Sequence, residues 1–369
     1  MSVKKHNGSR KKAPLLFGLT FRLILIVAGI AMILSYISVF INPSQISLPL
    51  FFGLYFIPIL ITNLVLLILA LIRRSKSAWI PIMVLLPALM FTDLFYKIGG
   101  DNSSDIEGIK LKIESYNVGM FSSSKLKYTK EECRIKVINH ITESNPDIAC
   151  FQEFHVNTKA QMDSILPQYK YRYYHVFKIQ NGKYFGNLIL SRFPIVSKGK
   201  LSFRRSTNLS IYVDIEHFGR IIRIYNNHLE SYNISFTALV QKLNKREKVL
   251  GDEIKNDIKE VHEKVLGTFI KRSDQVNKIM ENITQSSHPA IICGDFNDTP
   301  MSFTYHRLSK NRKDSFRESG SGFGASFIPL WPLLRIDYIL FPKEFGCINH
   351  KTHKIKLSDH YPISSDIII

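Results

Sequence analysis

Acidic residues are scarce in this chain of 369 residues, which has 30 Asp and Glu against 49 Lys and Arg and a formal net charge of +19. The first 100 residues hold ten of these basic residues and a single acid, Asp93, so about half of the charge belongs to that segment. The positive excess in residues 101–369 favours an anionic substrate or surface, and a solvated basic face is the ordinary alternative.

Cysteine is also scarce. The four cysteines form no CxxC pair and no other spacing typical of a metal site, which argues against a zinc site of the common patterns. Cys150 and Cys293 lie within apolar runs, so we interpret them as small core residues rather than disulfide partners. The chain has no internal repeats and no low-complexity tracts.

No charged residue occurs from Leu23 to Ile72. This stretch is too long for one membrane span and fits two, because each span needs about 20 apolar residues. We predict spans near residues 17–41 and 50–72, with Pro58 tolerated in the second, and a third span near 78–96. A cleaved signal peptide is the alternative for the first span, but its apolar run is too long and no small-residue cleavage site follows.

The distribution of Lys and Arg predicts the orientation of these spans, since cytoplasmic loops are enriched in both. Five basic residues precede Ala13, the first loop has none, and Arg73, Arg74 and Lys76 lie in the second loop. We therefore expect a multi-pass integral membrane protein: a cytoplasmic tail (1–16), a three-helix transmembrane anchor (17–98), a polar linker (99–108) and an extracytoplasmic domain (109–369).

The clearest motif of that domain runs from Ile291 to Pro300, where three apolar residues lead into Gly-Asp-Phe-Asn. It predicts a buried strand that delivers Asp295 and Asn297 into a polar site, since residues two apart on a strand point the same way. The same residues are also good turn formers. Glu153 follows another apolar run, and a charge there is costly unless it is paired or metal-bound.

Six predicted strand ends carry polar residues in all. They are Asn117, Glu153, His228, Asp295 with Asn297, Asp337, and Asp359 with His360. Any one of them could be a cap, a turn or a buried polar group with satisfied hydrogen bonds. Their occurrence together, in this order, is much harder to explain in structural terms alone.

The motifs around these residues are Ser-Tyr-Asn-Val, Phe-Gln-Glu, Asn-Asn-His-Leu, Gly-Asp-Phe-Asn-Asp-Thr-Pro, Arg-Ile-Asp-Tyr-Ile and Ser-Asp-His-Tyr-Pro-Ile. From about Lys110 to the C-terminus the chain resembles the endonuclease/exonuclease/phosphatase superfamily, which includes DNase I-like nucleases, neutral sphingomyelinases and inositol-polyphosphate phosphatases. The resemblance implies a four-layered α/β sandwich with two packed, mostly antiparallel sheets flanked by helices. The three predicted membrane helices lie outside it.

The resemblance also implies metal-assisted hydrolysis of a phosphoester. Glu153 would bind Mg²⁺ or Mn²⁺ with help from Asn117 and Asp359, and hard oxygen ligands of this kind suit both ions.

Five further residues have implied roles in the chemistry. Asp295 would orient and deprotonate the attacking water, and Asn297 would hold that water or a phosphate oxygen. His360 would contact the phosphate, while Asp337 would fix its tautomer and favour its charged form. His228 would donate to a phosphate oxygen. The division of labour between Asp295 and His360 stays open.

Two further groups have an ordinary alternative. Candidate phosphate contacts, which could equally be a solvated basic rim, are Lys183, Arg192, Arg204 and Arg205. Candidates for a substrate-side loop, which we interpret slightly more readily as packing, are Phe323, Phe327 and Trp331.

The expected function is a membrane-anchored, Mg²⁺-dependent phosphoesterase that hydrolyses a phosphodiester. The basic charge favours an extracytoplasmic nuclease-type enzyme acting on nucleic acid. A lipid headgroup phosphodiesterase or phosphatase of the sphingomyelinase type is the alternative, because an anchor keeps the site near a lipid and a nuclease needs no membrane. A non-catalytic binding module on the same fold is disfavoured by the intact set of acids. The sequence indicates no protein partner.

Overall fold

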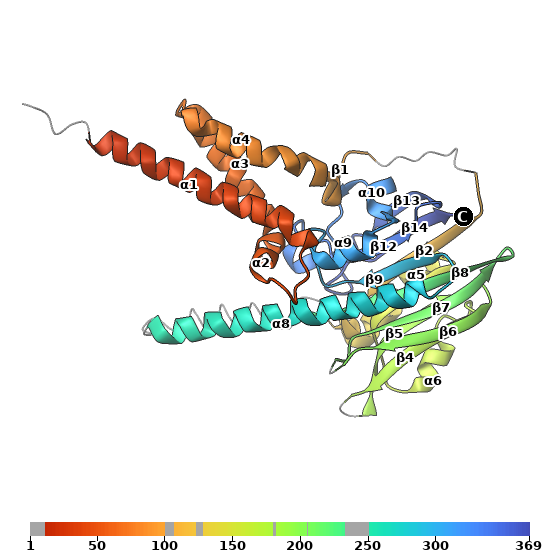
Figure 1. Ribbon diagram of the computed structural model, residues 1–369. Coiled ribbons are helices and arrows are strands. Elements are labelled where there is room, and N and C mark those ends of the chain that lie inside the picture. Colours follow the sequence, from red (N-terminus) through yellow and green to blue (C-terminus); the bar gives the residue numbers. More distant parts are fainter. Residues whose placement is uncertain (1–11, 100–106, 123–127, 180–181, 205, 233–250) are drawn as a thin grey trace, which may run out of the picture.

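The computed structural model describes residues 12–99, 107–122, 128–179, 182–204, 206–232 and 251–369 (Figure 1). Most of the predicted cytoplasmic tail, much of the linker and Arg205 lie outside these residues.

Two six-stranded sheets form the domain that follows the anchor. The first has the strand order β10 (Arg312–Asp314), β12 (Asp337–Pro342), β9 (Ala290–Asp295), β8 (Arg220–His228), β7 (Leu209–His217) and β6 (Ile195–Ser202). The second has the order β13 (Gly346–Thr352), β14 (Ile363–Ile368), β2 (Lys110–Asn117), β3 (Ile148–Val156), β5 (Tyr184–Ser191) and β4 (Tyr171–Lys178). Only the central pair of each sheet, β8 with β9 and β2 with β3, is parallel.

Alternating side chains along the strands build separate apolar layers. In β9, Ile291 and Cys293 face the core between the two sheets, whereas Ile292 packs beneath the helices on the outer face. Helices α8 (Gly251–Thr284) and α9 (Phe303–Ser309) cover the first sheet. Helices α5 (Lys130–Ser144) and α6 (Lys159–Ser164) cover the second, which gives four layers (Figure 1). The α/β architecture with two mixed sheets is as predicted.

The helix boundaries follow local chemistry. Thr129 and Glu132 form a reciprocal capping box at the start of α5. Asn145 ends that helix in the left-handed conformation, immediately before Pro146.

The N-terminal segment folds into α1 (Lys12–Ile37), η1 (Ser38–Phe40), α2 (Leu48–Leu54), α3 (Phe56–Ile72), η2 (Lys76–Ala78), α4 (Trp79–Leu85) and η3 (Leu86–Leu94). Within the described residues, only Phe17–Phe40 and Lys76–Leu94 are long and apolar enough to cross a membrane as unbroken helical segments.

The prediction of three such helices is therefore wrong for the middle one. Helices α2 and α3 are bent by 76° and would count as a third span only if taken together. Pro58 explains the break, because its ring has no N–H to donate to the carbonyl of Leu54 and clashes with that carbonyl. The helix is interrupted at Tyr55, between these two residues.

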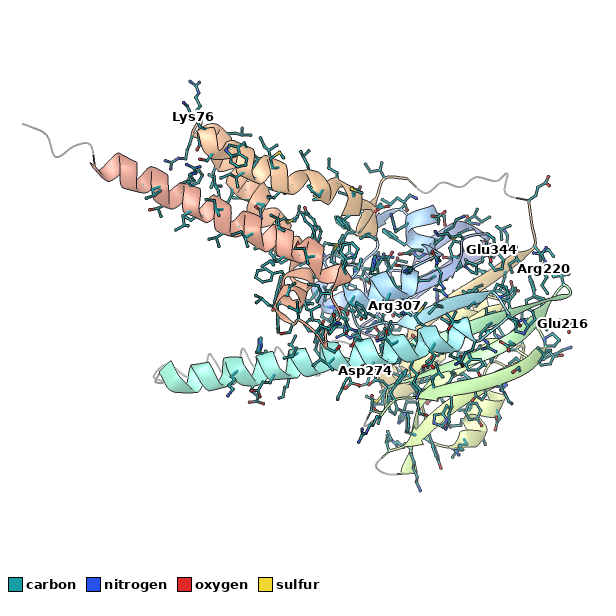
Figure 2. All side chains as sticks on the ribbon, in the orientation of Figure 1. Lys76, Glu216, Arg220, Asp274, Arg307 and Glu344 are labelled. Atoms are coloured by element: carbon teal, nitrogen blue, oxygen red, sulfur yellow. The ribbon has the colours of Figure 1, made fainter. Side chains whose placement is uncertain are left out.

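The basic turn and the domain lie at opposite ends of the anchor. Arg73 packs over the rings of Phe17 and Phe21 near the start of α1, at 4.4 and 4.9 Å. The other ends of α1 and η3 contact the domain. Lys76 and Arg220 accordingly stand at opposite ends of the molecule in Figure 2.

The anchor and the domain share one apolar core. Met32, Phe56 and Leu94 from the anchor belong to the same buried cluster as Phe296 and Met301 of the domain. The Ser38 hydroxyl, 3.1 Å from the Met301 backbone oxygen, donates a hydrogen bond to it. The anchor is therefore packed onto the domain rather than merely tethered to it.

Candidate active site

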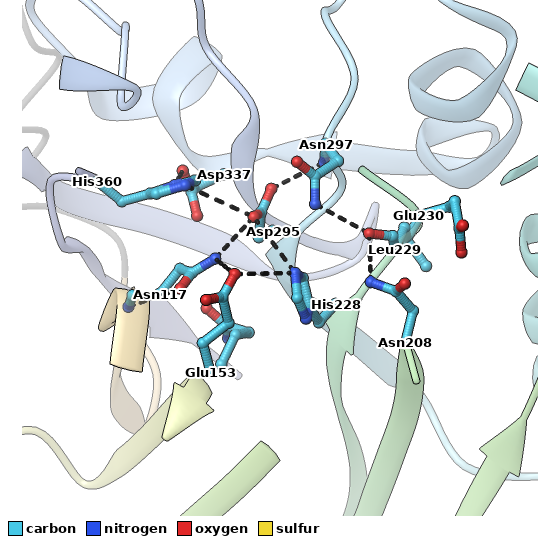
Figure 3. A network of polar contacts seen from close by, with 12 residues as sticks. Asn117, Glu153, Asn208, His228, Leu229, Glu230, Asp295, Asn297, Asp337 and His360 are labelled. Atoms are coloured by element: carbon cyan, nitrogen blue, oxygen red, sulfur yellow. Dashed lines mark hydrogen bonds and ion pairs between the residues drawn. The ribbon is translucent and has the colours of Figure 1, made fainter. Parts of the chain in front are cut away.

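The six polar strand ends meet at one edge of the sandwich (Figure 3). The central parallel pairs bring the C-terminal ends of β2, β3, β8 and β9 to this edge. Strand β12 runs antiparallel to β9, so its first residue, Asp337, stands directly opposite the last residue of β9, Asp295. The two sheets thus supply the site residues from both sides.

Asp295 lies at the centre of the site. One of its oxygens accepts a hydrogen bond from Asn117 Nδ2 at 2.9 Å and lies 3.7 Å from His360 Nε2 and 4.0 Å from His228 Nε2. The other oxygen accepts from the backbone N–H of Asn297 at 2.8 Å. Burial raises the pKa of the Asp295 carboxyl above its ordinary value, even though the adjacent His360 opposes this shift.

His360 and Asp337 form a buried acid–histidine pair. Their Nδ1 and Oδ2 atoms are 2.8 Å apart. Burial alone would lower the pKa of His360, but the carboxylates of Asp337 and Asp295 hold it well above its ordinary value. This raised pKa favours the imidazolium form of His360, whose Nε2 lies 3.7 Å from an Asp295 oxygen.

Glu153 reaches the site because β3 contains a bulge. Phe151 pairs with Leu188 and Phe154 with Gly186, so Gln152 and Glu153 together stand opposite one residue of β5. Strict alternation would turn Glu153 towards the outer helices. The bulge and its left-handed backbone, with φ of 52°, bring its carboxylate instead to 3.4 Å from His228 Nε2 and 3.3 Å from Asn117 Nδ2.

The oxygen-rich donor set fits a divalent cation. Three carboxylates belong to this set, those of Glu153, Asp295 and Asp337. That of Glu153 is the most accessible, with 25 % of its side chain exposed against 1 % for the other two. Asp337 Oδ1 is buried with no hydrogen-bond partner among the residues described. These acids outnumber the neighbouring histidines, which is the charge balance expected around Mg²⁺ or Mn²⁺.

Two predicted metal ligands, Asn117 and Asp359, lie beside each other in the site. Asn117 faces Glu153 and Asp295 with its amide nitrogen, while its oxygen accepts from the Gly119 N–H at 3.0 Å, so the amide must turn over to ligate a cation. Asp359 lies beside it, because Ser358 Oγ is 2.8 Å from the Asn117 backbone oxygen and 3.1 Å from Asp359 Oδ1.

Asn297 is partly committed to the framework. Its Nδ2 donates to the backbone oxygen of Leu229 at 2.9 Å, and Asn208 donates to the same oxygen at 2.8 Å. The Asn297 side chain therefore ties the end of β9 to the segment after β8. Its predicted contact with water or phosphate stays a prediction.

Arg192 does not belong to the site. It follows Ser191, which pairs with Ile148 at the start of β3, far along the strand from Glu153. Its Nε donates to the Pro146 carbonyl oxygen at 3.3 Å. Its interpretation as a phosphate contact is therefore wrong. Arg204, in contrast, follows β6 at the end where that sheet reaches His228.

A buried ion pair behind the site was missed in the sequence. Arg272 of α8 is fully buried and its Nη1 lies 3.0 Å from Asp298 Oδ2. It also donates to the backbone oxygen of Asn297. The signal was available, since Arg272 follows Phe269 by three residues and precedes Val276 by four on the buried side of the helix. Arg272 is a positioning residue for the Asp295–Asn297 segment.

The comparisons with known proteins agree with this geometry. The model of the endonuclease/exonuclease/phosphatase family matches residues 115–360. The chain belongs to this family. Its members are phosphoesterases and generally depend on a divalent metal. A second model, a domain of unknown function, matches residues 17–93, which is the anchor. No curated protein matches the chain.

Several solved structures are similar to this member of the family. An endonuclease/exonuclease/phosphatase from Beutenbergia cavernae is 15% identical, with a TM-score of 0.49, over 70% of this chain and 72% of that one. Truncated TDP2 from Caenorhabditis elegans is 17% identical, with a TM-score of 0.47, over 72% and 100%. The human Nocturnin catalytic domain is 18% identical, with a TM-score of 0.49, over 71% and 96%.

We predict that Arg272→Met destabilises the full chain by about 3 kcal/mol or more, because it leaves Asp298 buried and unpaired. In detergent micelles the melting temperature should fall by at least about 5 °C. Adding Asp298→Asn should recover part of the loss by removing the unpaired charge. Lys264→Met on the same helix breaks only an exposed pair with Glu260 and should cost less than about 1 kcal/mol. Equal, small effects of both single changes would contradict the positioning role.

We also predict that Asp337→Asn lowers the pKa of His360, because the lost carboxylate stabilises the imidazolium. An NMR titration of the metal-free chain in micelles measures this shift, and Asp366→Asn, far along β14, should leave it unchanged. The hydrolysis rate of the Asp337→Asn, His360→Ala double variant should be little below that of His360→Ala, since the two residues act as a unit. Fully multiplicative losses would show that they act independently.

Proposed function

We propose that this chain is a membrane-anchored, divalent-metal-dependent phosphoesterase whose catalytic domain lies outside the cytoplasm. The observation that carries the proposal is the convergence, at one edge of the sandwich, of a buried acid, a charged acid–histidine pair and an accessible carboxylate. A binding module without catalysis would have no need to keep these costly buried charges.

The reaction assigns a task to each central residue. Asp295, a stronger base than an exposed carboxylate, takes a proton from the attacking water. The water oxygen forms a bond to phosphorus as the ester P–O bond breaks, and the leaving oxygen takes a proton from solvent water. His360 Nε2–H and His228 donate to the phosphate oxygens, whose charge grows in the transition state.

Glu153 and Asp359 would hold the metal, with Asn117 joining them once its amide is turned. When bound, Mg²⁺ or Mn²⁺ offsets negative charge on the phosphate and the leaving oxygen. The chain's own contribution is to hold Glu153 in the bulge of β3, where its carboxylate lies beside Asn117 and His228.

The proposed orientation is supported by the anchor. Arg73, Arg74 and Lys76 lie at the end opposite the domain, and such basic turns stay in the cytoplasm. The candidate substrates are nucleic acid, supported by the positive charge, and a lipid headgroup, supported by the anchor.

We predict that Glu153→Gln, which keeps the shape but removes the charge, lowers the hydrolysis rate by about 100-fold or more at low Mg²⁺. Raised Mg²⁺ or Mn²⁺ should restore part of the activity, and EDTA should abolish that of the parent chain. Glu143→Gln, exposed on α5, is the matched control and should leave the rate unchanged. An unchanged rate for Glu153→Gln at low metal would remove Glu153 from the site.

The orientation can be tested with single introduced cysteines, because all four native cysteines are buried. In intact cells a membrane-impermeant maleimide should label Arg220→Cys, at the far end of the domain. It should label Lys76→Cys, in the basic turn, only after the cells are permeabilised. The opposite labelling pattern would rule out an extracytoplasmic domain.

A further inference from the structure

The catalytic edge of the sandwich is the edge that faces the anchor. Strand β8 ends at His228 in the site, and the next residue, Leu229, lies in the core shared with anchor residues such as Met32. The β7–β8 turn at Phe218 lies at the other end of this nine-residue strand, roughly 30 Å away. Figure 1 shows that turn on the side of the domain remote from α1 and α4.

The end of the last membrane helix is joined to the loop beside His360. Strand β1 (Tyr96–Lys97) follows η3 and pairs antiparallel with β11 (Gly322–Phe323). Further along the same loop, the ring of Phe327 lies 5.3 Å from that of His360. The backbone N–H of Ile328 donates to the Asp359 carbonyl oxygen at 2.8 Å. The anchor therefore supports one wall of the site directly.

That wall carries an exposed apolar surface, which we call the rim patch. Its members are 38–47 % exposed, and they are Tyr96, Phe323, Leu330, Trp331 and Leu333. The rings of Tyr96 and Phe323 are 4.9 Å apart, and those of Phe323 and Trp331 are 6.0 Å apart. Lys354 Nζ lies 5.3 Å from the Trp331 ring. Trp, Tyr and Lys with apolar neighbours are the residues that favour a membrane–water interface.

The rim patch lies at a defined depth. Tyr96 comes two residues after Leu94, the last residue of the candidate span, so the proposed anchoring places it at the level of the lipid headgroups. Phe323 is its direct strand partner, and Trp331 contacts Phe323. An exposed apolar surface at this place lowers the free energy of contact with a bilayer.

We infer that the site opens towards the bilayer that holds the anchor and that its substrate is a phosphoester in the headgroup of a lipid of that bilayer. This inference rests on the proposed phosphoester hydrolysis. Hydrolysis of a P–O bond in the headgroup puts OH on phosphorus and H on the leaving oxygen. The charged headgroup fragment then separates from the lipid-bearing fragment. The basic charge of the chain suits an anionic lipid surface as well as it suits nucleic acid.

The first test compares substrates for the full chain reconstituted with Mg²⁺. Each lipid substrate is presented in vesicles, and the lipids are phosphatidylcholine, phosphatidylethanolamine, phosphatidylglycerol, phosphatidic acid and sphingomyelin. The water-soluble probes are p-nitrophenyl phosphate mono- and diesters and a single-stranded oligonucleotide. We expect hydrolysis of at least one lipid. Hydrolysis of the oligonucleotide or the small probes without any lipid would overturn this inference alone, and no hydrolysis at all would overturn the proposed function.

The second test changes the rim patch and leaves the site intact. Leu330→Ser with Leu333→Ser should lower the rate on vesicle lipid by at least about tenfold, because interfacial apolar area is lost, and leave the rate on the small probes within about twofold. Phe218→Ser is the matched control, since this side chain is 72 % exposed at the remote turn. Equal losses on lipid and on small probes, or equal effects of both variants, would overturn the role of the patch.

The third test locates the rim patch without an activity measurement. Trp79 and Trp331 are the two tryptophans of the chain, so Trp79→Phe leaves Trp331 as the sole fluorophore. In phosphatidylcholine vesicles, its emission should be quenched by lipid spin-labelled near the headgroup and protected from aqueous iodide. Full quenching by iodide with none by the labelled lipid would overturn the inference.

Discussion

The packing of the anchor against the segment after β9 constrains the rest of the molecule. Met32 and Phe56 share a buried cluster with Phe296 and Met301, which flank Asn297 in the loop after β9. Each such side chain contributes roughly 1.5–3 kcal/mol when fully buried. The position of this loop therefore depends on the anchor, and removing the anchor would leave an apolar surface exposed beside the site. The anchor and the catalytic domain are one folding unit in this respect.

Charge compensation is the second constraint on the site. Asp295 is buried against Asn117 and two histidines, and Asp298, three residues later, is buried against Arg272. Hydrogen bonding is incomplete in both places: among the described residues, Arg272 Nε and Nη2 and Asp337 Oδ1 are buried without a partner. Glu153, in the same site, has a left-handed backbone conformation. Unsatisfied buried groups and backbone strain persist at sites selected for chemistry rather than stability.

Many of the strands could be predicted because apolar and polar residues alternate along them with a period of two. Strand β9, in contrast, was predicted from a short apolar run that leads into Gly-Asp-Phe-Asn, and its antiparallel register with β12 brings Asp295 and Asp337 together. Glu153 was identified by type, but the bulge that turns it into the site breaks the period and has no local signature. Arg272 was missed because arginine is ordinarily solvent-exposed, although its spacing from Phe269 and Val276 indicated the buried side of the helix. The break at Tyr55 depended on Pro58, whose effect on the helix was underestimated.

The rigid connection between anchor and domain bears on the substrate. A flexible linker would suffice to keep an enzyme at a membrane, where confinement alone raises the effective concentration of a lipid. This chain goes further: β1 pairs with β11, and Gly324 N–H donates to the Phe95 carbonyl oxygen at 3.0 Å. These contacts fix the height and direction of the site relative to the span that ends at Leu94. A fixed height suits the lipid substrate proposed above, because a lipid headgroup itself stands at a fixed height in the bilayer.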